Sequence, residues 1–520
     1  MARPDAEQIR QLLQRHEASE RIRQNQQGLG RPIIAGKFHG HQIVAVKNTV
    51  HWSPTWKTFP DFLADYIKRV IGPEWGNAEI AKPFQQRHPL MQWYDTYCRY
   101  QQATIAKPGV VSEATITGIV ACYLGLAYSL YLLDHNVELQ ELLVRRLKDP
   151  ANFQGAYYEL MVANILVRAG FTLTLEDETD RQSKHCEFAA TSKQTGKKYW
   201  VEAKMRAVSG LFGKTDIDGT SDPNPLSRLI PHLNRALAKP AADERLIFID
   251  LNGERDDPAA GTPAWVEAAA KRLEQYEAKE TVAGTQAYVF VTNMSYHRNL
   301  DELPAGSALP FGLGMPDFNR PGYLRLREGH ALKMKHIDAH HIGEMFGKYL
   351  QFPQTFDGGL PSEAFGQGTG RVLIGETYRF GDGNGGEIVG TVTTASVSEE
   401  ESRVYIGVTG SDGVARILSN PLSPDELADY RANREAYFGR IQPVGRKITS
   451  RVEFFDWLMS TNKNLPREEL LGRLARAPDI DALRSATNDE LLAAYCEGMV
   501  AAFEASGFKT DAAPDQHETV

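Results

Sequence analysis

Residues 153–293 carry an order of helix-like and strand-like segments that few folds accommodate. A helical pattern over 153–169 ends at Gly170, and glycine commonly terminates helices. Three strand-like runs follow, and helices and strands then alternate. The strand-like runs are 171–178, 185–192, 197–206, 245–253 and 286–293, and the later helices are 225–239, divided or kinked at Pro231, and 264–280. The order α-β-β-β-α-β-α-β predicts an α/β domain of about 150 residues.

The chain has 520 residues, which is too long for one simple core, so we expect several regions. The first should be mostly helical, with strands at 32–52 and one long or two joined helices at 112–147. The central α/β region comes next, and a stretch rich in Pro and Gly should be an irregular connector. An α+β region and a disordered tail should end the chain. The expected bounds are 1–150, 151–300, 301–370, 371–508 and 509–520.

Net charge, cysteine content and hydrophobic runs constrain the partners and the cellular location that we expect for the protein. A protein that coats nucleic acid is usually basic, so the net charge of −8 argues against such a protein, although it is compatible with a local basic patch. Four widely spaced cysteines predict reduced thiols, and the polar N-terminus lacks an apolar signal segment, so we expect a cytoplasmic protein. Residues 114–133 carry no charge, but glycines, hydroxyl side chains and tyrosines dilute the run. We therefore favour a buried helix over a membrane span.

The run 200–206 places a carboxylate beside an ammonium group. Side chains of a strand alternate between its two faces, so Val201, Ala203 and Met205 form one apolar face. Glu202 and Lys204 then share the opposite face with Trp200 and Arg206. Taken alone, such a pair is most often an ordinary exposed strand pair.

Two further carboxylates are expected to approach this pair. If the hairpin turns near Thr195, residues whose numbers sum to about 390 face each other, and Glu187 faces the Glu202–Lys204 region. Glu159 stands in an otherwise apolar helix stripe, where a carboxylate needs a compensating cation. A salt bridge to Arg168 or to another cation would satisfy it. A divalent ion would relieve both burial and repulsion, and oxygen ligands favour Mg²⁺ or Mn²⁺.

This pattern resembles the PD-(D/E)XK phosphodiesterase superfamily, which has a restriction endonuclease-like central mixed sheet flanked by helices. The resemblance rests on Glu187 followed fifteen residues later by Glu202-Ala203-Lys204, after a helix bearing Glu159, and covers about 150–300. It implies that Glu202 and Glu187 bind metal, that Glu159 supports the metal, and that Lys204 orients or activates water. The chain departs from the family in having Glu187 where the first strand acid is normally Asp, which puts the metal geometry in doubt.

Basic residues surround the motif. Eight Lys or Arg side chains lie between 181 and 214, against two acids, Glu187 and Glu202. Such a patch can hold phosphates, although a solvated lysine-rich hairpin tip would look the same. Arg228, Asn234 and Lys239 could extend it. The candidate nucleic-acid contacts are Lys184, Lys197, Lys198, Arg206, Lys214 and Arg235.

The sequence therefore predicts a Mg²⁺- or Mn²⁺-dependent nuclease, a DNA endonuclease of a restriction or defence type. Flanking regions would select the substrate, a second copy or a protein partner, and no membrane would be involved. One alternative is a catalytically inactive nuclease-fold protein that binds nucleic acid or another partner, and the Glu187 departure favours it. Another is an unrelated protein whose strands mimic the motif. A phosphate-binding G-x-x-x-x-G-K-[ST] loop and a G-x-S-x-G nucleophile elbow are both absent from the sequence.

Overall fold

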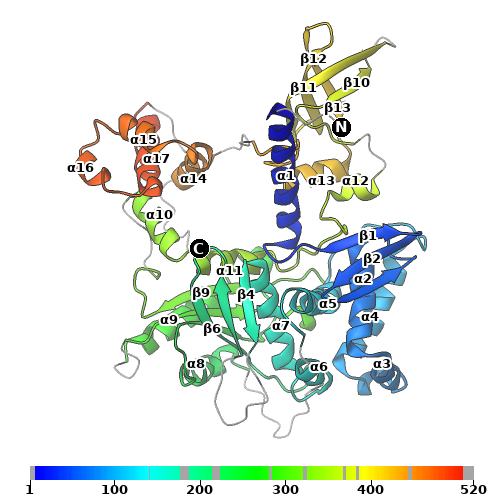
Figure 1. Ribbon diagram of the computed structural model, residues 1–520. Coiled ribbons are helices and arrows are strands. Elements are labelled where there is room, and N and C mark those ends of the chain that lie inside the picture. The colour runs from blue at the N-terminus through cyan, green and yellow to red at the C-terminus, as the bar shows by residue number, and fades with distance from the viewer. Residues whose placement is uncertain are drawn as a thin grey trace.

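Figure 1 shows the computed structural model, in which a main body carries two smaller modules. A four-stranded sheet lies at the top of the view beside the long helix α1 (Ala6–Gln27), and a helical module lies to the left. The structure describes residues 6–139, 141–175, 187–213, 223–279, 284–319, 322, 325–366, 370–381, 386–442 and 448–506.

The main body is built on a six-stranded mixed sheet in the order β4-β5-β6-β7-β8-β9. The first three strands are antiparallel neighbours, β6 to β8 are parallel, and β9 is antiparallel to β8. The strands are β4 (Phe171–Leu175), β5 (Phe188–Ser192), β6 (Lys198–Met205), β7 (Glu244–Asp250), β8 (Ala287–Asn293) and β9 (Ser307–Leu313). The five predicted strands are therefore confirmed within the described residues, and β9 extends the sheet.

Helices cover both faces of this sheet, so the predicted α/β class is confirmed. The face with Val201, Ala203 and Met205 packs against α7 (Phe153–Arg168) and α11 (Ile337–Gly347). The opposite face packs against α8 (Leu229–Leu237) and α9 (Ala264–Glu277). The expected break near Pro231 falls slightly earlier, where a 3₁₀ turn (Pro225–Arg228) leads into α8. Pro231 itself fits the first turn of α8, where backbone N–H groups lack helical partners.

One buried aspartate fixes the β5–β6 hairpin to α11. Asp338 accepts hydrogen bonds from the hydroxyls of Ser192, Thr195 and Tyr199, at 2.6, 2.6 and 2.8 Å. The turn between the strands contains Gly196 in the left-handed conformation, with φ of 72°. The hairpin register is thus held by side chains as well as by backbone pairing.

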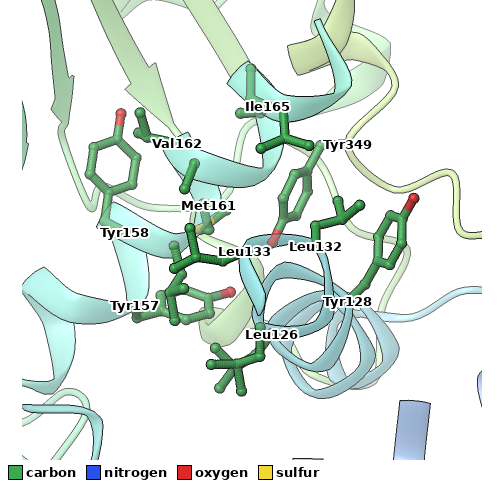
Figure 2. Packing of buried hydrophobic residues seen from close by; sticks show 14 of the residues in the cluster. Leu126, Tyr128, Leu132, Leu133, Tyr157, Tyr158, Met161, Val162, Ile165 and Tyr349 are labelled. Atoms are coloured by element: carbon green, nitrogen blue, oxygen red, sulfur yellow. The ribbon is translucent and has the colours of Figure 1, made fainter. Parts of the chain in front are cut away.

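The N-terminal region shares its hydrophobic core with α7. Helix α5 (Gly118–Asn136) lies against α7, and Figure 2 shows Leu126 and Leu133 packed near Tyr157 and Met161. Helix α5 is apolar enough to cross a membrane, but 94% of its most apolar window is buried inside the protein, as expected for a core helix. The other elements are β1 (Ile34–Phe38), β2 (His41–Val46), β3 (Thr49–Ser53), α2 (Phe59–Ile71), α3 (Pro73–Ile80), α4 (Pro89–Thr104) and α6 (Glu141–Lys148).

The expectation of irregular structure over 301–370 is wrong for much of that stretch. It contains β9, α10 (Leu326–Lys335), α11 and α12 (Pro361–Phe365). The Pro and Gly residues that suggested a connector separate short elements: Gly314 ends β9 at φ of 68°, and Pro361 begins α12. Short helices between such residues carry little periodic signal.

The C-terminal region is α+β, as expected from the sequence. Its antiparallel sheet consists of β10 (Thr377–Gly381), β11 (Glu387–Ser398), β12 (Arg403–Gly410) and β13 (Ala415–Pro421). This sheet packs against α1 and α13 (Pro424–Ala432). The helical module contains α10 together with α14 (Arg451–Asn462), α15 (Arg467–Arg473), α16 (Ile480–Leu483) and α17 (Asn488–Ala505). The predicted tail, 509–520, lies outside the described residues.

Candidate functional site: a carboxylate–lysine cluster

Strands β5 and β6 bring Glu187, Glu202 and Lys204 together. Phe188 pairs with Val201, and extending this register by one residue places Glu187 opposite Glu202. The Lys204 ammonium lies 2.5 Å from Glu187 Oε1 and 2.6 Å from Glu202 Oε1. The predicted convergence of these three side chains is present, and it follows from the period-two alternation of the two strands.

A second lysine enters the same cluster from the segment after α8. Lys239 Nζ lies 2.5 and 2.9 Å from the two carboxylate oxygens of Glu202, and 3.7 Å from Glu187 Oε1. Glu202 is 98% buried, whereas the side chains of both lysines reach solvent. Sequence reasoning considered Lys239 only as a phosphate contact. Its pairing with Glu202 depends on how α8 packs on the sheet, which no local pattern encodes.

Glu159 is near the cluster but has its own cation. The two terminal nitrogens of the Arg146 guanidinium donate to its carboxylate oxygens, at 2.5 and 2.8 Å. Of the alternatives that the sequence left open for Glu159, the structure therefore shows a salt bridge to a cation other than Arg168. Arg168 is fully buried elsewhere and donates to the backbone oxygen of Tyr349. Glu159 and Glu187 line one small cavity of about 20 Å³, enough for a single water molecule, whose other walls are mostly apolar.

Burial and neighbouring charges shift the acidities in this site. Burial, followed by repulsion from Glu187, raises the pKa of Glu159 to about 7, although Arg146 opposes the shift. Burial also raises the pKa of Glu202, against the effect of Lys204. Burial opposes ionisation of Glu187 and of Lys204, but their mutual attraction outweighs it, so the pKa of Glu187 falls and the pKa of Lys204 rises. The two carboxylates therefore favour the charged form of Lys204.

The donor set fits a divalent ion, but its present packing does not leave room for one. Three carboxylates from two strands and a helix supply the oxygen ligands that Mg²⁺ and Mn²⁺ prefer. Glu202 Oε1 is buried, and neither ammonium group meets it with the angles of a hydrogen bond. Across the part of the chain that the structure describes, however, no three His, Cys, Asp or Glu side chains are arranged to share a metal. The space between Glu187 and Glu202 holds two lysine ammonium groups.

The expected nucleic-acid contacts separate into distinct groups. Lys197 and Lys198 are exposed at the far end of β6, each about 3.9 Å from an acidic side chain, Glu244 or Asp243. These two lysines therefore agree with the second interpretation of the basic residues, a solvated hairpin tip. Arg235 is exposed on α8. Lys184 and Lys214 lie outside the described residues.

Arg206 does not belong to an exposed phosphate surface. Its side chain is buried, and it donates to the backbone oxygens of Leu251 and Asn252, at 2.6 and 3.0 Å. It therefore ties the end of β6 to the segment after β7. The alternation of side chains along the strand does not reveal that backbone carbonyls accept from Arg206 at that end of β6.

A histidine beside the lysines escaped the sequence reasoning. His232 of α8 is buried, and neither of its ring nitrogens has a hydrogen-bond partner. Burial, together with the positive charges of Arg235, Lys204 and Arg228, lowers its pKa to about 4. The imidazole is therefore uncharged at neutral pH and lies in the positive field of α8 and Lys204. Only its position in the sequence, seven residues before Lys239, hinted at this placement.

The class of protein defined so far is an α/β protein with a partly open carboxylate–lysine cluster on its central sheet. No model of a protein family matches the sequence, and neither curated proteins nor solved structures include a significant match. Function must therefore be argued from the site itself.

Proposed function

We propose that the protein is a metal-dependent phosphodiesterase of the PD-(D/E)XK type that cleaves nucleic acid, DNA in the first instance, in the cytoplasm. The observation that carries the proposal is the meeting of Glu187, Glu202 and Lys204 across β5 and β6. The mixed sheet with helices on both faces, preceded by the helix α7 that bears Glu159, supports it, because the resemblance implies that arrangement. Arg228, just before α8, and Arg235 on α8 add exposed positive charge near the site for a phosphate backbone.

In this proposal the acidic residues of the site bind the ion, and Lys204 contacts the phosphate. Glu187 and Glu202 would hold the ion, with Glu159 nearby. When bound, a divalent ion supplies a positive charge for the phosphoryl oxygens and makes water more acidic. Lys204 remains charged, so it would donate to an oxygen of the phosphate and stabilise the negative charge that develops during hydrolysis.

A nuclease assay tests this proposal directly. Plasmid DNA, single-stranded DNA and RNA are each incubated with the full chain in Mg²⁺, in Mn²⁺ and in EDTA. We expect cleavage that requires the divalent ion and that falls roughly 10²–10³-fold in Lys204→Met, the range for removing one charge-stabilising donor. The matched control is Lys271→Met, which removes an exposed lysine of α9 and should cleave normally. Absence of ion-dependent cleavage with every substrate would refute the nuclease proposal.

The second candidate is a nuclease-fold protein that binds without cleaving. The two lysines that neutralise Glu187 and Glu202 favour it, because the cluster is balanced in charge without any metal. Its flanking sheet also exposes apolar side chains suited to a protein partner: Ile34, Phe38, Val50 and Trp52. A binding module would retain nucleic-acid affinity in Lys204→Met and show no turnover in either form.

A further inference from the structure

Lys239 supplies one of the two ammonium groups that lie against Glu187 and Glu202. Its ammonium group contacts both oxygens of Glu202, at 2.5 and 2.9 Å, and stands 3.7 Å from Glu187 Oε1. The Lys204 ammonium group lies 2.5 Å from Glu187 Oε1 and 2.6 Å from Glu202 Oε1, two oxygens that Lys239 also approaches. Two carboxylates are thus balanced by two ammonium groups in a cluster that is mostly buried.

A divalent ion cannot simply be added to this arrangement. It would bring two further positive charges close to two ammonium groups, in a partly desolvated site where repulsion is screened less than in water. One ammonium group has to leave for the ion to enter, and the charge of the cluster then rises by one unit instead of two.

Lys239 is the lysine that can leave. Lys204 stands on the central strand β6, two residues from Glu202, and its backbone pairs with Ile249 of β7, so the sheet fixes the position of its Cα. Lys239 lies two residues beyond Leu237, the last residue of α8, and its side chain is 21% exposed. Its long side chain can turn into solvent without any movement of the sheet.

We propose that the Lys239 ammonium group holds the place of the divalent cation between Glu187 and Glu202, and that its displacement sets the metal affinity of the site. The inference rests on the proposed function only in taking this cluster to be a metal site. Lys239 is then a positioning residue. Its ammonium group keeps the two carboxylates close together in the metal-free protein and moves away when the ion binds them.

Calorimetric titration of the metal-free full chain with Mn²⁺ tests the inference without any substrate. Lys239→Met keeps the apolar stem and removes the charge, and we expect it to bind Mn²⁺ roughly 10–100-fold more tightly than the unaltered protein, the range over which residues around a site change metal affinity. Lys271→Met should bind as the unaltered protein does. Adding Glu202→Gln to Lys239→Met should abolish the gain.

Thermal unfolding gives a second readout, because Lys239→Met leaves a carboxylate charge uncompensated. Mn²⁺ should raise the melting temperature of Lys239→Met by more than it raises that of the unaltered chain. If Lys239→Met fails to fold without metal, recovery of the fold by Mn²⁺ supports the inference, and failure to recover it counts against it.

The outcomes separate this inference from the nuclease proposal. Equal or weaker Mn²⁺ binding in Lys239→Met overturns the role of Lys239 even if the protein cleaves nucleic acid. Tighter binding with no cleavage by either form supports the role of Lys239 and refutes the nuclease. No Mn²⁺ binding by either form overturns both.

Discussion

At the scale of single residues, the site consists of acids whose positions follow from strand periodicity and cations whose positions do not. Period-two alternation and a hairpin turn place Glu187, Glu202 and Lys204 on one face, as the sequence predicted. The partners Arg146 and Lys239 come from the last turn of α6 and from the segment after α8. They meet the acids only after helices pack on the sheet, so local pattern cannot assign them. The need of Glu159 for some cation was predictable from its apolar surroundings.

The Arg146–Glu159 pair yields a prediction at this scale. Removing Arg146 by Arg146→Met leaves a carboxylate that is almost fully buried without its cation. Breaking a buried pair from one side costs about 3–5 kcal/mol, so we expect the free energy of unfolding to fall by about 3 kcal/mol, since Arg146 is partly exposed. Urea unfolding at pH 7.5 measures this loss.

The double variant Arg146→Met/Glu159→Gln provides the control for the pair. It removes both charges, so it should recover most of the stability lost in Arg146→Met, and the coupling between the two positions should exceed about 1 kcal/mol, or about a fivefold change in the folding equilibrium. Additive effects of the two substitutions would show that the pair contributes nothing beyond its separate side chains.

At the scale of elements, most helices and strands were predictable where their periodic runs were long. The helix over 153–169 and the strands around it agree with α7 and β4 to β8 to within a few residues in the described ranges. The failures are β9 and the short helices of 301–370, whose runs are interrupted by Pro and Gly. Hairpin register was predictable to about one residue, and Asp338, more than 140 positions away in sequence, holds it in place.

Helix α4 begins at a buried histidine, and this arrangement predicts a pH-dependent stability. His88 Nδ1 accepts the backbone N–H of Leu90, and the ring packs between Trp75 and Phe153. Burial lowers the pKa of His88 to about 4, with Lys82 acting in the same direction and Glu79 and Asp149 opposing it. Protonation would remove the acceptor at the start of α4 and place a charge among aromatic rings.

The sign of the effect follows from the two pKa values. An unfolded histidine binds a proton near pH 6.5, whereas folded His88 stays neutral until about pH 4. The stability that His88 contributes is therefore complete above pH 6.5 and is lost as the pH falls towards 4. One proton is bound, and each unit of pKa difference corresponds to about 1.4 kcal/mol, so the total loss is up to about 3 kcal/mol. His88→Asn keeps a capping side chain but does not titrate.

Urea unfolding at pH 7.5 and at pH 5 measures this contribution. Other buried histidines titrate as well, so the difference between the unaltered chain and His88→Asn isolates His88. We expect the variant to lose less stability between the two pH values, while His16→Asn, which changes an exposed position of α1, should lose as much as the unaltered chain. A His88→Asn variant with an unchanged pH slope would contradict the assignment.

At the scale of the whole molecule, the sequence suggested a boundary between two regions at residue 150, but one hydrophobic core extends across that position. Tyr128 of α5, Tyr157 of α7 and Val201 of β6 belong to one continuous cluster. The region rich in helices and the α/β region therefore depend on each other for burial. The boundary was inferred from a change in pattern, and a change in pattern marks a change of secondary structure, which need not be the edge of a core.

This shared core leads to a prediction about fragments. A chain of residues 151–366 would expose the side of α7 that α5 covers, including the neighbours of Tyr157 and Met161 in Figure 2. Burial of apolar surface contributes about 25 cal/mol per Å², and a domain is stable by only about 5–15 kcal/mol in total, so uncovering a helix face exceeds that margin. A chain of residues 28–366 keeps α2, α4 and α5 and should unfold cooperatively in urea, whereas 151–366 should aggregate or unfold without a cooperative transition. If 151–366 were to unfold as sharply as 28–366, α5 would be a detachable cover, and the carboxylate–lysine cluster would belong to an independent domain.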